Sequence, residues 1–219
     1  MTLKKFEKPE GKEHLDKDFL EELKHKIWST KGTRFTADNR LKSLSKISSF
    51  STNILSLYLI IFGLLSVYNI YNPSKETESF FAFSLTATSI LLLLFSLFES
   101  SQDYKVKAKY FHDCGLDLAD LYNDLQNFKS YRKGASDSEK MEFCHQLQHR
   151  YQNVLRRYEN HKPIDNRMFK ASHLDYYKNL KSYYWFLVQI EYFIKTRLIY
   201  LVAIIVPAII LIILIFYDN

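Results

Sequence analysis

Two groups of residues have types and spacings that could bind a metal ion. His145 and His149 are one helical turn apart, with Cys144 beside them. His112 lies two residues before Cys114. Imidazole and thiolate groups at such spacings can bind zinc or copper. Both cysteines, however, occupy apolar positions of predicted helices, where a thiol is usually a small buried group. We therefore expect no metal site and no cofactor, with a metal centre as the weaker alternative.

The sequence lacks the signatures of common enzyme sites. It contains no Walker loop, no dinucleotide glycine fingerprint, no HExxH motif and no nucleophile elbow. The formal net charge is +6. In a chain with long apolar runs, a positive balance points first to cytoplasmic loops and anionic lipid headgroups. We predict that the protein is not an enzyme and do not expect it to bind nucleic acid directly.

Small and hydroxyl-bearing side chains recur at three- and four-residue spacing within two apolar runs. Such residues let membrane helices approach closely and form hydrogen bonds across the contact. They could pack the two helices of one chain, or line an aqueous path where several chains assemble. No ionisable residue lies inside these runs, which argues against pumping through buried carboxylates. The residues of this polar stripe are Thr52, Asn53, Ser56, Gly63, Ser66, Thr86 and Ser89.

A second candidate site is the segment ENHKPID at 159–165. Packing alone explains its composition poorly. His161 with Asp165 could staple the turn between two helices. Contact with a signalling partner is the alternative.

The elements that must position these residues are membrane-spanning helices. Residues 47–98 contain two apolar runs without a charged residue, joined by a polar turn around Pro73. About 20 apolar residues cross the hydrocarbon core, where the backbone must be helical. A third such run covers 198–217. We predict an all-α membrane protein with an N-terminal transmembrane helical hairpin, a cytoplasmic helical bundle and a third, C-terminal transmembrane helix.

This pattern divides the chain into four segments: a basic segment 1–46 with an amphipathic helix, the hairpin 47–98, the bundle 99–197 and the third span 198–217. Gly32 is expected to break the amphipathic helix. Span two is expected to continue straight into a bundle helix. A capping box of Ser136 and Glu139 predicts the start of the next helix. A further long helical stretch is expected after Asp165.

Two bundle helices carry apolar seams at heptad-like spacing, which is typical of helices that pack along their length. The first seam is Tyr104, Phe111, Cys114, Leu118, Leu121, Leu125 and Phe128; the second is Cys144, Leu147, Tyr151, Val154 and Tyr158.

Charge asymmetry orients the spans. Basic residues crowd the chain before span one, after span two and before span three, whereas the hairpin turn carries Lys75 against Glu76 and Glu78. The positive-inside rule therefore predicts a cytoplasmic N terminus and an external C terminus. Tyrosines and Trp185 just before span three are typical of an aromatic belt at the lipid interface, and stacking on nucleic-acid bases is the alternative.

Three motifs resemble the SLATT domain family, the SMODS and SLOG-associating two-TM effectors. They are IWSTKGTRFTADNRL before span one, AKYFHDCGLDLADLY after span two, and LRRYENHKPIDNRMFK. The last is similar to the subgroup associated with reverse transcriptases. The resemblance carries no catalytic residues. The residues of these motifs that we take as signal or partner contacts are Trp28, Arg34, Arg40, Glu159, Asn160, His161 and Asp165.

The resemblance implies a membrane effector of a bacterial anti-phage or conflict system. We expect a homo-oligomer in the inner membrane that permeabilises the lipid bilayer when triggered from the cytoplasm. Its expected partner is a reverse transcriptase or a nucleotide-signalling protein. The alternative is a non-conducting anchor or adaptor that localises a partner enzyme such as a reverse transcriptase.

Overall fold

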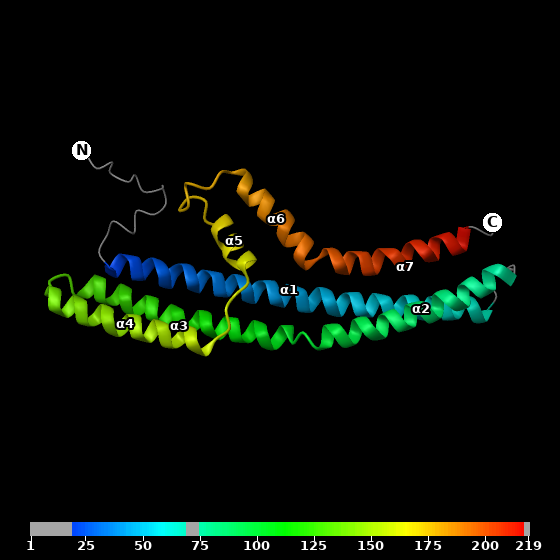
Figure 1. The fold of residues 1–219 in the computed structure, drawn as a ribbon, viewed down its shortest axis with the longest axis horizontal. Helices are drawn as coiled ribbons and strands as arrows, with labels where there is room; N and C mark the ends of the chain where they lie inside the picture. The colour runs from blue at the N-terminus through cyan, green and yellow to red at the C-terminus, as the bar shows by residue number, and fades with distance from the viewer. Residues whose placement is uncertain (1–18, 69–74, 217–219) are drawn as a thin grey trace, which may run out of the picture. The chain divides into compact units, whose positions relative to one another are not determined.

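The protein is helical throughout the part that the structure describes. The computed structural model describes residues 19–68 and 75–216 (Figure 1). These ranges contain seven helices and no strand, which confirms the predicted all-α class. The predicted turn around Pro73 lies outside them. The helices are α1 Phe19–Tyr68, α2 Lys75–Ser100, α3 Tyr104–Tyr131, α4 Asp137–Arg157, α5 Pro163–Ala171, α6 Tyr183–Thr196 and α7 Leu198–Phe216.

The helices form two compact units. One, which we call the bundle unit, contains α1 up to Leu41 together with residues 106–192. The other, the apolar unit, contains residues 42–105 and the chain from Phe193 onward. Helix α1 is a single 50-residue helix that contributes to both units.

Buried positions recur every seven residues in α1, both in the part that belongs to the bundle unit and in the part that belongs to the apolar unit. Every seventh residue of α1 from Leu20 to Phe62 is buried, and a second row three residues later is buried or half-buried. This is the a/d spacing of helices that pack along their length. In the bundle unit the first row includes an arginine, and in the apolar unit it includes a serine. The first row is Leu20, Ile27, Arg34, Leu41, Ser48, Leu55 and Phe62.

Gly32 does not break α1, contrary to expectation. The helix continues through it, and the ring of Phe169 from α5 lies against the glycine. A Cβ atom placed on Gly32 would lie only 2.0 Å from Phe169 Cε2. The glycine therefore serves a close approach between two helices, which its missing side chain permits.

The two predicted seams meet in the core of the bundle unit, which confirms the helical bundle. Helix α4 folds back along α3 (Figure 1), and the two helices pack with the first part of α1. The capping box of Ser136 and Glu139 forms as predicted, with Glu139 N–H 3.3 Å from Ser136 Oγ. The buried core is Leu20, Leu23, Ile27, Cys114, Leu118, Leu121, Leu125, Cys144, Leu147 and Val154.

Two helix boundaries differ from the prediction. Span two does not run unbroken into α3, because the helix is interrupted at 101–103 and Asp103 has a left-handed φ of 50°. The long helix expected after Asp165 is divided: α5 ends at Ala171, and α6 begins only at Tyr183. The turns between them place Tyr177 in a buried position. A buried aromatic residue in a turn thus lies where one continuous helix was predicted.

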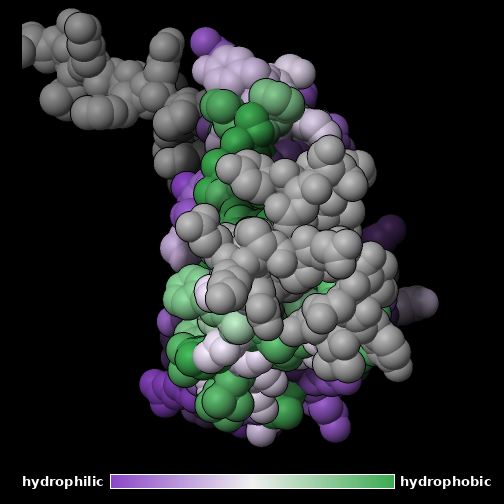
Figure 2. All heavy atoms as spheres, turned by 90° about the vertical axis from the view of Figure 1, so that its right-hand side faces the viewer, coloured by the Kyte–Doolittle hydropathy of each residue, from purple (hydrophilic) through white to green (hydrophobic). Residues whose placement is uncertain are grey.

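The apolar unit buries several hydroxyl-bearing residues and exposes many large apolar ones. Ser48, Ser51, Ser84 and Thr88 are buried, whereas many leucine, isoleucine and phenylalanine side chains of α1, α2 and α7 are exposed. Hydrophobic side chains also lie at the surface on the face that Figure 2 shows. Water would disfavour so much exposed apolar surface, but lipid tails do not. The pattern is that of a unit embedded in a bilayer.

The described helices support membrane crossing by length and composition. Two helical segments are long and apolar enough to cross a membrane: one lies within Phe19–Leu65 and the other within Ala82–Tyr131. A third candidate appears only if the bent pair Tyr183–Thr196 and Leu198–Ile210 is taken as one broken span.

Candidate functional site: a buried ionic joint in the bundle unit

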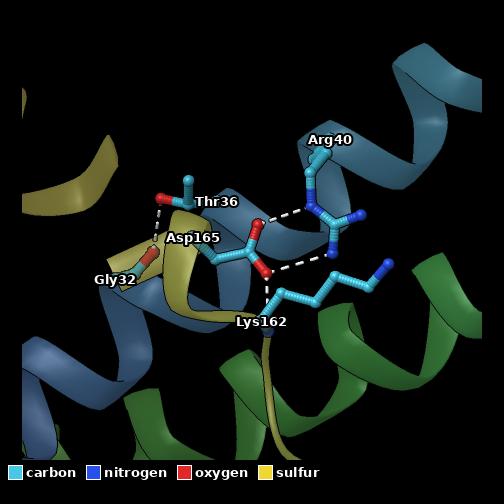
Figure 3. A network of polar contacts seen from close by, with 5 residues as sticks. All are labelled: Gly32, Thr36, Arg40, Lys162 and Asp165. Carbon is cyan, nitrogen blue, oxygen red and sulfur yellow. Dashed lines mark hydrogen bonds and ion pairs between the residues drawn. The ribbon is translucent and has the colours of Figure 1, made fainter. Parts of the chain in front are cut away.

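A buried ion pair joins α1 to α5. Arg40 donates from Nε to Asp165 Oδ1 at 2.7 Å and from an Nη nitrogen to Oδ2 at 3.0 Å (Figure 3). The side chains are 3% and 0% exposed. Two parallel charge-assisted bonds fix both distance and orientation, which a lysine could not do. We call this pair and the contacts around it the ionic joint.

The start of α5 places Asp165 for this role. Lys162 is the N-cap and Pro163 occupies the first turn, where its missing N–H costs nothing. Asp165 sits at the third helical position, and its Oδ2 accepts the backbone N–H of Lys162 at 3.0 Å. One carboxylate therefore both caps α5 and clamps it to α1. The staple predicted between His161 and Asp165 is thus made by Lys162 and Arg40 instead.

Arg34 lies six residues before Arg40 and is 1% exposed. Its guanidinium donates to the backbone carbonyl of Glu159 and lies 5.4 Å from the centre of the Phe111 ring. Its Nε has no hydrogen-bond partner among the described residues. A desolvated cation with incomplete pairing is costly to a fold. Arg34 is therefore a buried cation whose guanidinium is only partly paired.

His161 lies beside this cation. It is half-buried, and its Nδ1 has no hydrogen-bond partner among the described residues. Burial and the charge of Arg34 lower the pKa of His161, and the charge of Asp165 opposes this only in part. The folded protein therefore favours the neutral imidazole at this position.

Sequence reasoning missed two further contacts of the joint. Asp38 is 3% exposed and lies 3.1 Å from His112 Nδ1 on α3. Asn166 of α5 donates to the buried Thr33 hydroxyl at 3.3 Å. Arg34 occupies the seven-residue repeat of α1, and Asp38 follows it by one turn. Arg34 is the one charged residue in that repeat and was a signal for this part of α1, but no sequence pattern singled out Asp38 or Asn166.

Trp28 anchors the same chain segment on the N-terminal side of the joint. Its ring lies 5.0 Å from Phe169, 5.3 Å from His173 and 4.9 Å from Tyr176, measured between ring centres. Aromatic contacts at these distances stabilise packing beyond the area they bury. The tryptophan therefore holds the end of α5 and the following turns against α1.

The structure brings most of the predicted contact residues together. Trp28, Arg34 and Arg40 all meet the segment 159–177. Glu159 contributes its backbone carbonyl to Arg34. Asn160 is exposed. The joint thus unites two motifs that are more than a hundred residues apart in sequence.

The candidate metal residues do not converge. Both cysteines are free and buried, and His145 and His149 are exposed on α4. In the described parts of the chain, no group of three His, Cys, Asp or Glu residues could hold a metal ion.

The polar stripe lies beside the buried face of the apolar unit. Asn53, Thr86 and Ser89 are exposed, and Thr52 and Ser56 are half-buried. A Cβ atom on Gly63 would meet nothing within 4 Å. The side chain of Ser66 lies outside the described residues. Four of the hydroxyls donate to carbonyls one turn earlier in their own helices: those of Thr52, Ser56, Thr86 and Ser89.

The apolar unit contains one polar contact that was not predicted. Tyr200 of α7 is 2% exposed and donates to Glu99 Oε2 at 2.9 Å. Tyr104 lies 3.3 Å from the same hydroxyl. The span prediction ended at Phe98, one residue before this glutamate. The contact ties α7 to the end of α2.

Comparison with known proteins identifies the family. The model of the SMODS and SLOG-associating 2TM effector domain family 5 matches residues 16–213, which include the whole ionic joint and all but the end of α7 in the apolar unit. Comparison with curated proteins and with solved structures gave no match. The chain therefore belongs to the SMODS and SLOG-associating 2TM effector domain family, as a member of family 5.

Proposed function

We propose that the protein is the membrane effector of a bacterial anti-phage or conflict system. It lies in the inner membrane with its N terminus and bundle unit in the cytoplasm and its C terminus outside. When a cytoplasmic trigger reaches the bundle unit, several chains act together to permeabilise the membrane. Family membership and the exposed apolar surface of α1, α2 and α7 support the membrane role.

The open polar stripe is the observation that carries the pore proposal. Packing within the chain uses the neighbouring face of α1, on which Ser48 and Ser51 are buried. The stripe itself, with Asn53 exposed and open space at Gly63, remains available to other chains. Two or three helices cannot enclose a water column, so a pore needs several hairpins. Small residues at the contact permit close approach of their helices.

The ionic joint is the proposed receiver of the trigger. It ends at Arg40, one residue before the bundle unit gives way to the apolar unit on the same helix. Buried ion pairs have a few favoured geometries, so they suit elements that change between discrete states. A partner that displaces α5 from α1 would release the pre-membrane turn of α1. The exposed Asn160, next to Glu159, lies where a reverse transcriptase or a nucleotide-signalling protein could make contact.

Membrane permeability in cells tests this function. The protein is expressed with its neighbouring genes, cells are challenged with phage, and a potential-sensitive dye is followed. The effector account predicts depolarisation that requires both the protein and the trigger. An unchanged membrane potential would contradict the effector function. If a partner enzyme were then recovered in the membrane fraction only when this protein is present, the anchor function would replace it.

A further inference from the structure

Helix α6 presents an apolar face to its surroundings. Its residue Val188 is 2% exposed, and Tyr184 and Tyr192 pack beside it against α5. On the other side Phe186 is 59% exposed. Exposed apolar and aromatic side chains recur there at spacings of one, three and four residues, which places them on one side of a helix. This face consists of Tyr183, Phe186, Leu187 and Ile190.

The composition and setting of this face favour lipid as its occupant. An aromatic and apolar face of this kind rarely stands open to water. Lys181 precedes the helix, Lys195 lies in its last turn, and both are exposed. The chain then enters the apolar helix α7 directly after Arg197. Amphipathic helices with aromatic and aliphatic residues on one side and basic residues nearby lie in the lipid interface.

We propose that α6 lies along the cytoplasmic membrane surface, with the face of Tyr183, Phe186, Leu187 and Ile190 inserted at the boundary between headgroups and acyl chains. On this proposal α7 alone (Leu198–Phe216) makes the third span, and α6 is neither part of a span nor a free helix of the bundle. The inference rests on membership of a membrane family and is independent of pore formation. The proposal refines the aromatic belt expected from sequence. Tyr184 of that belt packs inward against α5, whereas the neighbouring Phe186 and Leu187 face outward.

The lipid contact is connected to the ionic joint through two packed helices. Glu191 of α6 accepts from Arg167 of α5 at 2.6 Å. Ile164, Met168 and Ala171 of α5 complete the contact with the inward side of α6. The same short helix carries Asp165. A change in how α6 sits in the membrane would therefore act on the helix that holds Arg40.

Site-directed spin labelling of the full chain in vesicles of phosphatidylethanolamine and phosphatidylglycerol tests the proposal. Cys114 and Cys144 are replaced by alanine, and a label is placed at Phe186→Cys or at Gln152→Cys, an exposed position on α4. The label at 186 should collide with oxygen far more often than with a water-soluble nickel chelate, at a depth of about 5–10 Å. The label at 152 should show the opposite preference.

Three results would overturn the proposal. A label at 186 that is as accessible to the chelate as the label at 152 means that the face is in water. A label shielded from both reagents means that protein covers it. A label at the bilayer centre makes α6 part of a span.

Tryptophan fluorescence provides a second measurement that leaves both cysteines in place. The difference between Trp185→Phe and the double variant Trp185→Phe, Phe186→Trp isolates the emission of a tryptophan at position 186, which lies on the proposed lipid face. Lipids brominated near the headgroup should quench this emission more than lipids brominated near the chain end. Absence of quenching, or stronger quenching by the deeper bromines, would contradict an interfacial α6.

Discussion

Asp165 holds Arg40 through both of its carboxylate oxygens while one of them also accepts the Lys162 N–H. The contact closes a separation of 125 positions in the sequence. It therefore fixes the start of α5 on the last turn that α1 makes within the bundle unit.

Removing one charge from the pair should destabilise the bundle unit strongly. Asp165→Asn leaves Arg40 buried without its counter-charge, which typically costs about 3–5 kcal/mol. Thermal or denaturant unfolding of the detergent-solubilised protein measures the loss. Asp124→Asn is the matched control, because its partner Arg150 is 54% exposed and exposed pairs contribute only about 0–1 kcal/mol. Equal losses for both variants would show that the joint is not a buried ion pair.

A single methyl group at Gly32 should disturb the contact between α1 and α5. The Cβ of Gly32→Ala would overlap the Phe169 ring, and overpacking of this kind costs about 1–3 kcal/mol. Gly63→Ala is the control, because its Cβ meets nothing within 4 Å. Phe169→Leu should recover part of the loss in the Gly32→Ala background. If Gly32→Ala unfolds at the same temperature as wild type, the close approach of Phe169 is wrong.

The sequence predicted the elements better than their contacts. Apolar runs and heptad-like seams are local patterns, so the spans and the core around Leu121 could be predicted. The pairing of Arg40 with Asp165 is not local, and both residues look like ordinary surface charges in sequence. Gly32 was misread because a helix-breaking propensity costs only about 1 kcal/mol, which the packing of Phe169 outweighs.

The polar stripe shows a different limit of sequence reasoning. Serine and threonine occur on two adjacent faces of α1, and periodicity alone does not decide which face packs within the chain. The structure buries Ser48 and Ser51, and Ser51 lies one residue before Thr52 of the predicted stripe. The family resemblance was needed to recognise ENHKPID as a motif, and its structural partner, Arg40, emerged only from the fold.

Acid should destabilise the protein partly through His161. Burial and the charge of Arg34 lower the pKa of His161 in the folded state, so the unfolded chain binds its proton first as pH falls. Stability is therefore full above the ordinary histidine pKa of about 6.5 and falls below it. Unfolding temperatures at pH 7.5 and about 5.5 should differ less in His161→Gln than in wild type. His149→Gln, at an exposed site on α4, should leave the difference unchanged.

An unchanged pH response in His161→Gln would assign the effect to other groups.

Topology follows from the charge distribution around the spans. A reporter active only in the periplasm should give a signal when fused after Asn219 and none when inserted at Gly134, the open turn between α3 and α4. A cytoplasmic reporter should give the reverse pattern. Periplasmic signal at Gly134 would invert the orientation and place the ionic joint on the wrong side for a cytoplasmic trigger.

The most direct test of the central claim is triggered depolarisation in Gly63→Leu. Leucine inserts readily in lipid, and a Cβ atom at position 63 meets nothing within 4 Å, so the variant should express and insert normally. It should nevertheless separate hairpins of different chains that must meet closely, and depolarisation should be lost. Gly134→Leu, the same substitution at an open position outside the spans, should depolarise cells as wild type does. Equal depolarisation by wild type and Gly63→Leu, at equal membrane levels, would contradict the assignment of this stripe to the pore.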